Sequence, residues 1–215
     1  MLLRGMAIVA ESLECGGKGT CSPFIMKWFA DRGLKAIHTR EPGGTPYAEK
    51  LREILISKEH NAPAISDALG FYASRCDHTQ NLILPALQSG TNVLCERYYD
   101  SSLAYQSTYL PKVFDVHELC KPYLIEPDLV LFLNISAETS VARMEKRRIE
   151  KSIPLDKFES KGLEFLSQVR ENYLMQSKDA SGNPKPNWRI IDAEQPLEQV
   201  VADIYKVLDD FFQVG

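Results

Sequence analysis

A loop with two glycines and a lysine follows an apolar, strand-like run near the start of this chain. Residues 6–10 read MAIVA, and residues 11–20 read ESLECGGKGT. Gly16 and Gly17 let the backbone approach an anion closely, and the Lys18 ammonium can bridge the terminal phosphates of a nucleotide. In the order strand, loop, helix, the loop amides point at phosphate from a helix N-terminus. The feature predicts a phosphate-binding loop at the start of an α/β fold.

The loop departs from the strict P-loop pattern, G-x-x-x-x-G-K-[ST], at two positions. Ser12 stands where the pattern has glycine, and Gly19 stands where it has a hydroxyl side chain. Thr20, one place later, can still contact phosphate, and adenylate-kinase-like loops also read Gly-Lys-Gly-Thr. For these ten residues alone, a glycine-rich turn that binds nothing is the alternative, so the rest of the chain must decide.

Apolar, β-rich runs alternate with segments whose apolar residues recur at helical spacing. The expected strands are residues 6–11, 34–39, 92–96, 129–134 and 188–191. The expected helices are residues 18–31, 46–57, 64–89, 100–109, 137–147, 157–177 and 196–212. Such alternation predicts a five-stranded parallel sheet flanked by helices on both faces, a three-layer α/β fold. The 215 residues fit one domain, residues 1–215, whose ligands bind at the carboxyl ends of the strands.

Charge and composition exclude several classes of protein. The formal net charge of −4 gives no broad basic field for nucleic acid, and no apolar run approaches the roughly 20 residues of a membrane span. The five cysteines include no C-x-x-C pair, so we expect free thiols in a cytoplasmic protein. Cys15 is interpreted either as a small filler of the loop or as a thiol whose pKa is lowered at a helix N-terminus. Small phosphorylated ligands stay open as binding partners.

Two further motifs place arginines at the expected ligand edge of the sheet. Residues 39–45 read TREPGGT, and Arg40 in this turn suits a bidentate grip on phosphate. The alternative for Arg40 is a pair with a surface carboxylate. Phe71 and Arg75 lie four residues apart, so they share one helix face and can stack on and hydrogen-bond a base. Their alternative is a core phenylalanine and a surface arginine.

A carboxylate and a third arginine follow the third expected strand. Glu96 can order Mg²⁺ through water, because magnesium keeps several of its waters. Arg97 adds positive charge to the same edge of the sheet. An anion cradle, a lysine, Mg²⁺ and arginines that neutralise the moving group are the parts that phosphoryl transfer needs. The sequence therefore favours a phosphotransferase.

These motifs together identify a resemblance. The chain resembles the thymidylate kinases of the nucleoside-monophosphate kinase group over essentially its whole length. The residues that carry the resemblance are 11–20, 39–45, Phe71 with Arg75, 96–98 with 101–106, 127–129 and 191–193. The TREPGGT string is the most specific of them. The resemblance implies the P-loop kinase fold with a short lid, and transfer of the ATP γ-phosphoryl group to dTMP with Mg²⁺, giving dTDP and ADP.

The resemblance implies a donor site for ATP. Lys18 and the amides of residues 16–20 would hold the ATP phosphates, and Thr20 with Glu96 would hold Mg²⁺ through water. Ala193 and its neighbours would line the adenine pocket. The full set expected on the ATP side is Glu11, Ser12, Leu13, Cys15, Gly16, Gly17, Lys18, Gly19, Thr20, Arg143 and Ala193.

An acceptor site for dTMP is implied in the same way. Arg40 and Arg97 would grip the acceptor phosphate, and Phe71 would stack on thymine. Arg75 and Gln106 would contact the base edge. The full set expected on the dTMP side is Glu14, Arg40, Pro42, Phe71, Arg75, Arg97, Ser101, Tyr105 and Gln106.

Two residues of the acceptor set would lie next to the sugar. Glu14 falls where the family usually has an aspartate that contacts the sugar hydroxyl and the catalytic centre. Tyr105 would pack beneath the deoxyribose, where an aromatic ring excludes a 2′-hydroxyl. The Glu41–Pro42 peptide falls where the family often has a cis bond. Because Glu14 is one methylene longer than aspartate, reduced activity or a shifted acceptor is an open alternative.

The lid, about residues 144–156, decides the expected subtype. Some family members place an arginine in the P-loop at the position of Cys15, whereas others supply it from the lid. Because Cys15 cannot serve, the resemblance implies the lid-arginine, bacterial-like subtype, with Arg147 or Arg148 closing on the transferring group. Lys157 replaces a usual arginine beyond the lid. The family commonly forms homodimers, so a homodimer is expected.

Three other functions remain alternatives. The first is a related kinase for another deoxynucleotide, dUMP or dGMP, although the base-facing residues favour a pyrimidine. The second is a nucleotide-binding homologue with impaired catalysis, which Ser12 and Gly19 suggest; a lid arginine cluster argues against it, because binding alone does not need one. A GTPase is the weakest, because Asp67–Gly70 matches D-x-x-G but no N-K-x-D segment reads guanine.

Overall fold

A parallel sheet forms the centre of the computed structural model, which describes residues 4–60, 62–152 and 157–213. Within these ranges the sheet has five strands in the order β2-β3-β1-β4-β5, each parallel to its neighbours. The strands are β1 (Ala7–Ser12), β2 (Ala36–Arg40), β3 (Asn92–Glu96), β4 (Leu129–Asn134) and β5 (Trp188–Asp192). The predicted five-stranded α/β fold is therefore confirmed.

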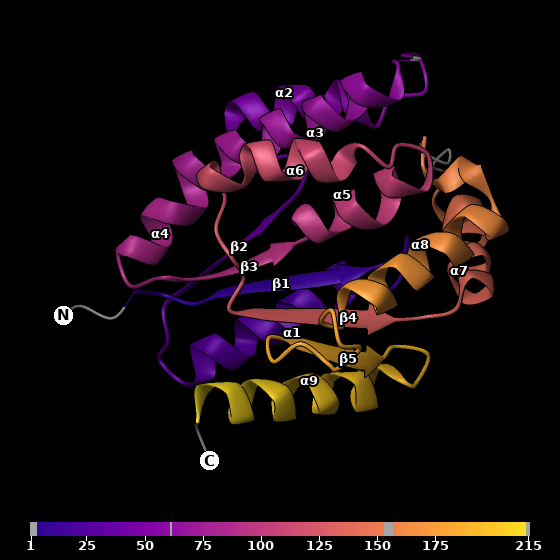
Figure 1. The fold of residues 1–215 in the computed structure, drawn as a ribbon. Helices are drawn as coiled ribbons and strands as arrows, with labels where there is room; N and C mark the ends of the chain where they lie inside the picture. The colour runs from indigo at the N-terminus through magenta and orange to yellow at the C-terminus, as the bar shows by residue number, and fades with distance from the viewer. Residues whose placement is uncertain (1–3, 61, 153–156, 214–215) are drawn as a thin grey trace.

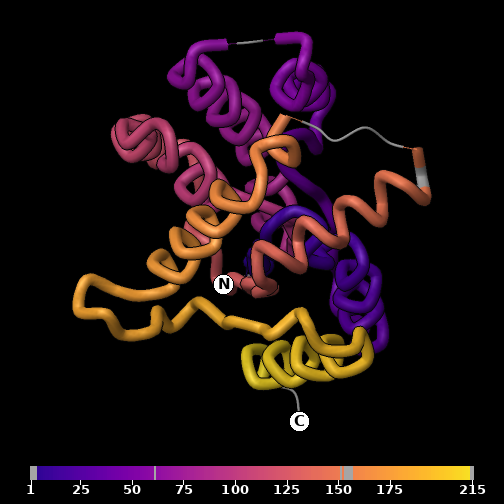
Figure 2. The backbone as a smooth tube through the Cα atoms, turned by 90° about the vertical axis from the view of Figure 1, so that its right-hand side faces the viewer, coloured from indigo at the N-terminus to yellow at the C-terminus, as the bar shows by residue number. Residues whose placement is uncertain are grey.

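Helices flank the sheet on both faces. The α-helices are α1 (Lys18–Asp31), α2 (Pro46–Leu55), α3 (Ala64–His78), α4 (Leu84–Gln88), α5 (Tyr99–Tyr105), α6 (Val113–Cys120), α7 (Ala137–Lys151), α8 (Leu163–Gln176) and α9 (Leu197–Phe212). Figure 1 shows α1 and α9 on the same side of the sheet, where Trp28 Nε1 donates to Asp209 over 2.9 Å. Figure 2 shows α1 and α8 on opposite sides of the strands. None of the helices described is long and apolar enough to cross a membrane.

The core lies between the central strands and these two helical layers. Both β1 and β4 are buried along almost their whole length, because helices cover both faces of the sheet. On one face Phe132 of β4 stacks on Tyr173 of α8, with ring centroids 4.9 Å apart. On the other, Trp28 packs against Phe212 at 5.2 Å. This packing fixes the carboxyl ends of the strands, where the loops of the site begin.

The single helix expected over residues 64–89 is interrupted. A π-helical turn, Thr79–Ile83, separates α3 from α4. Pro85 is the second residue of α4, and proline removes a backbone donor that a continuous α-helix needs. The wider turn accommodates this loss without ending the helical path.

Other helices, chiefly α6, α7 and α8, also differ from expectation. Instead of starting at Lys157, α8 starts at Leu163, because Gly162 has a φ of 85° and separates it from a 3₁₀ turn. The helix expected over residues 137–147 continues to Lys151, so α7 is longer than expected and extends into the expected lid. The helix α6 was not expected at all. Residues 153–156, the end of the expected lid, lie outside the described residues.

Candidate active site

A cleft opens at the carboxyl ends of β1, β2 and β3. It encloses about 750 Å³, including the space at its open mouth. All nine residues expected to bind dTMP line it, together with Lys18 and Glu96 from the ATP side. The lining residues are Glu14, Lys18, Arg40, Glu41, Pro42, Arg52, Ile56, Phe71, Arg75, Glu96, Arg97, Ser101, Ser102, Tyr105, Gln106 and Phe158. The fold therefore brings the expected acceptor residues and the phosphate-loop lysine into one site.

The phosphate-binding loop joins β1 to α1, as its glycines require. Gly17 is the N-cap of α1 and has a φ of 100°, a conformation that glycine adopts without strain. Lys18 begins the helix, and its Nζ donates to Ser12 Oγ at 2.6 Å, Leu13 O at 3.1 Å and Ser12 O at 3.2 Å. Burial lowers the pKa of Lys18 to about 8, and the positive charge of Arg97 adds to this shift.

Cys15 is a filler of this loop. Burial raises the pKa of its thiol above the ordinary value, because the charged thiolate is disfavoured away from water. The alternative of a reactive thiol with a lowered pKa is therefore wrong. All five cysteines of the chain are free thiols, as expected.

Glu14 and Arg97 form a half-buried ion pair in the wall of the cleft. Arg97 Nη2 lies 2.6 Å from Glu14 Oε1 and 3.4 Å from Tyr105 Oη. Burial raises the pKa of Glu14, but Arg97 and Lys18 outweigh it, so the net pKa lies below the usual value. Arg97 has a φ of 68°, in the left-handed region, which turns the chain sharply after β3. The Glu14 carboxylate, the Arg97 guanidinium and the Lys18 ammonium thus interact in one part of the cleft.

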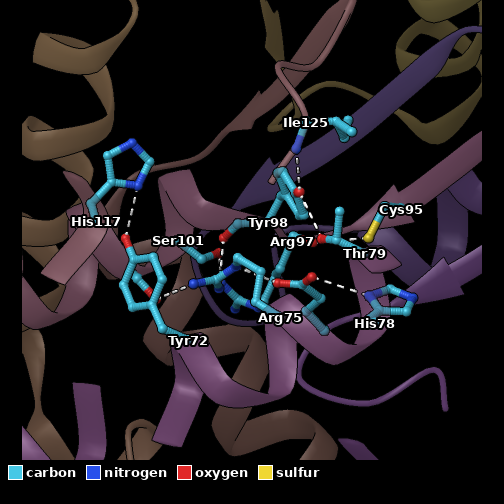
Figure 3. Close-up of polar contacts among 12 residues, drawn as sticks. Tyr72, Arg75, His78, Thr79, Cys95, Arg97, Tyr98, Ser101, His117 and Ile125 are labelled. Atoms are coloured by element: carbon cyan, nitrogen blue, oxygen red, sulfur yellow. Dashed lines mark hydrogen bonds and ion pairs between the residues drawn. The ribbon is translucent and has the colours of Figure 1, made fainter. Parts of the chain in front are cut away.

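Arg75 is held inside a hydrogen-bond network rather than on the surface. Its Nε donates to Glu41 Oε2 at 2.7 Å, its Nη1 to Ser102 Oγ at 2.9 Å and its Nη2 to Tyr98 O at 3.0 Å (Figure 3). His78 Nδ1 lies 3.1 Å from the second Glu41 oxygen. Phe71 is buried one turn before Arg75 and also lines the cleft. The alternative of a surface arginine is therefore wrong for Arg75.

Arg40 occupies the mouth of the cleft. Its Nη2 lies 3.0 Å from Glu49 Oε2, its Nη1 donates to Pro42 O at 2.8 Å, and the side chain is 44% exposed. Arg40 therefore pairs with a surface carboxylate, as the alternative expected, and also lines the cleft, while its grip on phosphate stays a prediction. The Glu41–Pro42 peptide in this turn is cis, as expected.

Glu96 faces the first turn of α1. Both carboxylate oxygens lie 3.9 Å from where a Cβ on Gly19 would stand, so the carboxylate lies within van der Waals distance of this turn. Glu96 Oε1 accepts from Ser22 Oγ at 2.7 Å and lies 2.9 Å from His38 Nε2. Burial raises the pKa of Glu96, but these hydrogen bonds outweigh it, so the net pKa lies below the usual value. An ionised carboxylate beside the loop suits an outer-sphere Mg²⁺ contact.

A second group of possible metal ligands lies deeper. Glu41, His78 and Cys95 bring ligand atoms within 4.8 Å of one another. Glu41 is paired with Arg75, and His78 Nε2 lies 2.7 Å from Thr39 Oγ1. Burial holds the pKa of Cys95 well above the usual value. These partners make the group a structural network, and we assign no ion to it.

The expected ATP-side residues divide into two groups. The side chain of Glu11 is fully buried and accepts from Tyr98 N, Ser101 Oγ and Tyr173 Oη at 2.8, 2.6 and 2.7 Å. Glu11 therefore has a structural role, because its hydrogen bonds connect β1 to α5 and α8 beneath the loop. In contrast, Gly19 and Thr20 are exposed at the start of α1, and Arg143 Nη2 donates to Ala193 O at 3.0 Å. This contact joins Arg143 of the expected ATP set to Ala193, the residue expected at the adenine pocket.

The two candidate lid arginines point to different partners. Arg147 pairs with the buried Glu159, and its charge acts on Cys15 in the phosphate-binding loop. Arg148 pairs with Glu145 one turn earlier on the exposed face of α7. The helix therefore places Arg147, not Arg148, towards the loop.

Sequence reasoning missed several residues of the cleft. Glu41 and Ser102 are the partners of Arg75, and Phe158 packs against Phe71 with ring centroids 5.7 Å apart. Arg52 donates to Pro42 O at 2.9 Å. Glu41 stood inside the TREPGGT string and could have been found there. Ser102 lay within residues 101–106, another segment that carries the resemblance. Arg52 comes from a segment without a motif, and only the fold reveals the contact between Phe158 and Phe71.

Known proteins are similar to this chain along almost its whole length. The family model described as Thymidylate kinase matches residues 11–204. A thymidylate kinase of Neisseria gonorrhoeae (strain NCCP11945) is 36% identical over 208 residues, which cover 95% of this chain and 97% of that protein. One of Francisella tularensis subsp. tularensis (strain WY96-3418) is 37% identical over 210 residues, with 95% and 96% covered. The chain belongs to the thymidylate kinase family. The match to the thymidylate kinase model begins in the phosphate-binding loop and ends within α9, so it spans the whole cleft.

Membership of the thymidylate kinase family confirms the resemblance inferred from the motifs. It makes the chain an ATP-dependent phosphotransferase by family. The parallel sheet flanked by helices agrees with the fold that the resemblance implied. The thymidylate kinase motifs Glu11–Thr20 and Thr39–Thr45 lie at the carboxyl ends of β1 and β2, two strands that have β3 between them.

Proposed function

We propose that the chain transfers the γ-phosphoryl group of ATP to dTMP, giving dTDP and ADP. One observation carries the proposal: a single cleft joins Lys18 and Arg97 at its phosphate end to Phe71 and Arg75 at its other end. Phosphoryl transfer depends on positioning and on charge stabilisation, and this cleft supplies groups for both. Measuring transfer from ATP to each deoxynucleoside monophosphate tests the proposal.

The acceptor would lie across the cleft. Arg97 and Arg40 would bind the dTMP phosphate, because a guanidinium fork matches phosphate oxygens. Phe71 would stack on thymine, and Arg75 and Gln106 would hydrogen-bond its edge. The Arg75 donors are aimed by Glu41, Ser102 and Tyr98 O, so the base would meet a preorganised site.

The ring of Tyr105 would pack against the deoxyribose. It is buried and lies with Arg97 over its face, 5.0 Å from the ring centroid. A fixed ring at this place leaves little room for a 2′-hydroxyl, which favours deoxynucleotides. Glu14, held by Arg97 beside Lys18, would face the sugar and the reacting phosphates.

The donor would lie on the opposite side of the loop. The backbone amides of residues 16–20 and Lys18 would hold the ATP phosphates at the N-terminus of α1. The contact between Arg143 and Ala193 O would form the edge of the adenine pocket. Glu96 and Thr20, an exposed residue in the first turn of α1, would hold Mg²⁺ through water. When bound, Mg²⁺ would supply neutralisation of phosphate charge.

The third positive group would come from the lid. Arg147 is the candidate, because its charge acts on Cys15 in the loop and Arg148 pairs with Glu145 on the exposed face. The chain would then follow the lid-arginine subtype. A related kinase for dUMP or dGMP and an impaired nucleotide-binding homologue remain outcomes of the acceptor test.

We also propose a homodimer formed through helices on one side of the molecule. Large apolar side chains are exposed on α2, α3 and α6, which lie side by side in Figure 1. They are Tyr47, Ile54, Ile65, Leu69, Phe114 and Leu119. Exposed apolar side chains that gather on neighbouring helices are typical of a protein interface. Sedimentation should give a dimer, and Leu119→Glu, at a side chain that is 70% exposed, should give a folded monomer; a monomeric wild-type chain would contradict this proposal.

A further inference from the structure

The hydroxyl of Ser12 contacts the ammonium of Lys18 inside the phosphate-binding loop. Ser12 is fully buried, and its Oγ lies 2.6 Å from Lys18 Nζ. The same hydroxyl donates to Leu13 O at 2.8 Å. Ser12 Oγ therefore accepts from the lysine and donates to the backbone, so both of its hydrogen-bonding functions are used within the loop.

The side chain of Ser12 fits only because Gly16 has none. A Cβ added to Gly16 would stand 2.5 Å from Ser12 Oγ and 2.6 Å from Ser12 Cβ. The two positions face each other across the loop and share one space. In the strict P-loop pattern the position of Ser12 is also a glycine. The strict pattern therefore supplies no hydroxyl from this position to the lysine.

This contact uses the last of the lysine donors. An ammonium has three N–H groups, and Lys18 Nζ donates to Ser12 Oγ, Ser12 O and Leu13 O. The hydroxyl is the nearest of the three acceptors, and it is the one that glycine could not supply. To bridge terminal phosphates, Lys18 must exchange at least one of these bonds for a phosphate oxygen.

We propose that Ser12 is a positioning residue that retains Lys18 within the loop and so weakens the binding of ATP. The inference rests on the proposed function, because it assumes that Lys18 binds the ATP phosphates. Nucleotide binding has to replace a short, charge-assisted hydrogen bond, and such bonds are among the stronger ones in proteins. The departure from the strict motif would then set the affinity for ATP without abolishing catalysis.

Calorimetric titration of ATP with Mg²⁺ into the full chain, without an acceptor, tests this. Ser12→Ala removes only the hydroxyl, and we expect it to bind ATP about 5-fold more tightly than the wild type. Ser12→Gly should behave in the same way, because it also lacks the acceptor. Ser177→Ala is a matched control: this serine is buried, its Oγ donates to Leu174 O at 2.8 Å at the end of α8, and its loss should leave ATP affinity unchanged.

The same titration in a Lys18→Ala background tests whether Ser12 affects ATP binding through Lys18. There, Ser12→Ala should no longer tighten ATP binding, whereas a purely structural effect of Ser12 would persist. Unchanged or weaker binding of ATP by Ser12→Ala would overturn the inference, as would equal tightening with and without Lys18. If the wild type transfers phosphate to dTMP but Ser12→Ala binds no more tightly, the inference fails alone. If the wild type binds no ATP, the proposed function fails with it.

Discussion

The protonation of Lys18 controls the charge at the phosphate end of the cleft. Burial and Arg97 lower its pKa to about 8, and Glu14, Glu11 and Glu96 partly offset that shift. The ammonium therefore loses its proton as the pH rises through about 8, and the charge that would attract ATP phosphates disappears.

We therefore predict that kcat/KM for ATP is level below pH about 8 and falls about tenfold per pH unit above it, because kcat/KM reports groups of the free enzyme. The measurement is a pH series of initial rates at low ATP. Lys18→Arg, whose guanidinium does not titrate in this range, should lose that alkaline limb even if its rate is lower. A wild-type profile that stays level to pH about 10 would show that Lys18 is not the group involved.

The hydrogen-bond partners of Arg75 and Ser12 could not be predicted from the sequence. The place of Arg75 on the ligand edge was predicted from its spacing with Phe71, but its buried partner Glu41 is 34 residues away in the chain. A contact over that distance depends on how β2 and α3 come together. The sequence shows that Ser12 departs from the motif, but only the fold reveals its contact with Lys18.

At the scale of elements, α7 separates two arginines that are adjacent in the sequence. Consecutive helical residues point about 100° apart, so the two side chains cannot share a target. Arg147 pairs with Glu159 and acts on the loop, whereas Arg148 pairs with Glu145 on the exposed face.

This separation predicts unequal effects of two alanine variants. Arg147→Ala should lower kcat roughly 1,000-fold, as loss of an arginine that neutralises transition-state charge does, while Arg148→Ala should lower it less than about 3-fold. Steady-state rates at saturating ATP and dTMP measure both. Equal loss in the two variants, or a larger loss in Arg148→Ala, would contradict the assignment of Arg147.

Strands with a strong apolar pattern could be predicted from the sequence, whereas the short helix α6 could not. The central strands are apolar throughout because both faces of the sheet are covered, so β3 and β4 begin and end where expected. In contrast, α6 has only eight residues, and short helices depend on tertiary packing rather than on propensity. Its His117 lies 3.1 Å from Tyr72 of α3, a contact between distant segments. Pro85 and Gly162 marked the breaks at the π-turn and before α8, and both signals were in the sequence.

At the scale of the whole molecule, the order β2-β3-β1-β4-β5 turns separate motifs into one site. Arg40 and Glu96 end neighbouring strands that pair residue by residue, and the phosphate-binding loop follows β1 on the other side of β3. The edge at which these residues meet could be predicted from the rule for parallel sheets. The closure of the cleft by Phe158 could not, because that residue reaches Phe71 from a distant segment.

The central claim is that this cleft is one phosphotransferase site with dTMP as its acceptor. The most direct measurement compares kcat/KM for dTMP, dUMP, dCMP, dGMP and dAMP with ATP and Mg²⁺, using a coupled assay for ADP. We predict transfer to dTMP with a kcat/KM at least about tenfold above that for either purine nucleotide, and no detectable transfer by a folded Lys18→Ala variant. Absence of transfer to every acceptor, or preference for a purine, would contradict the account.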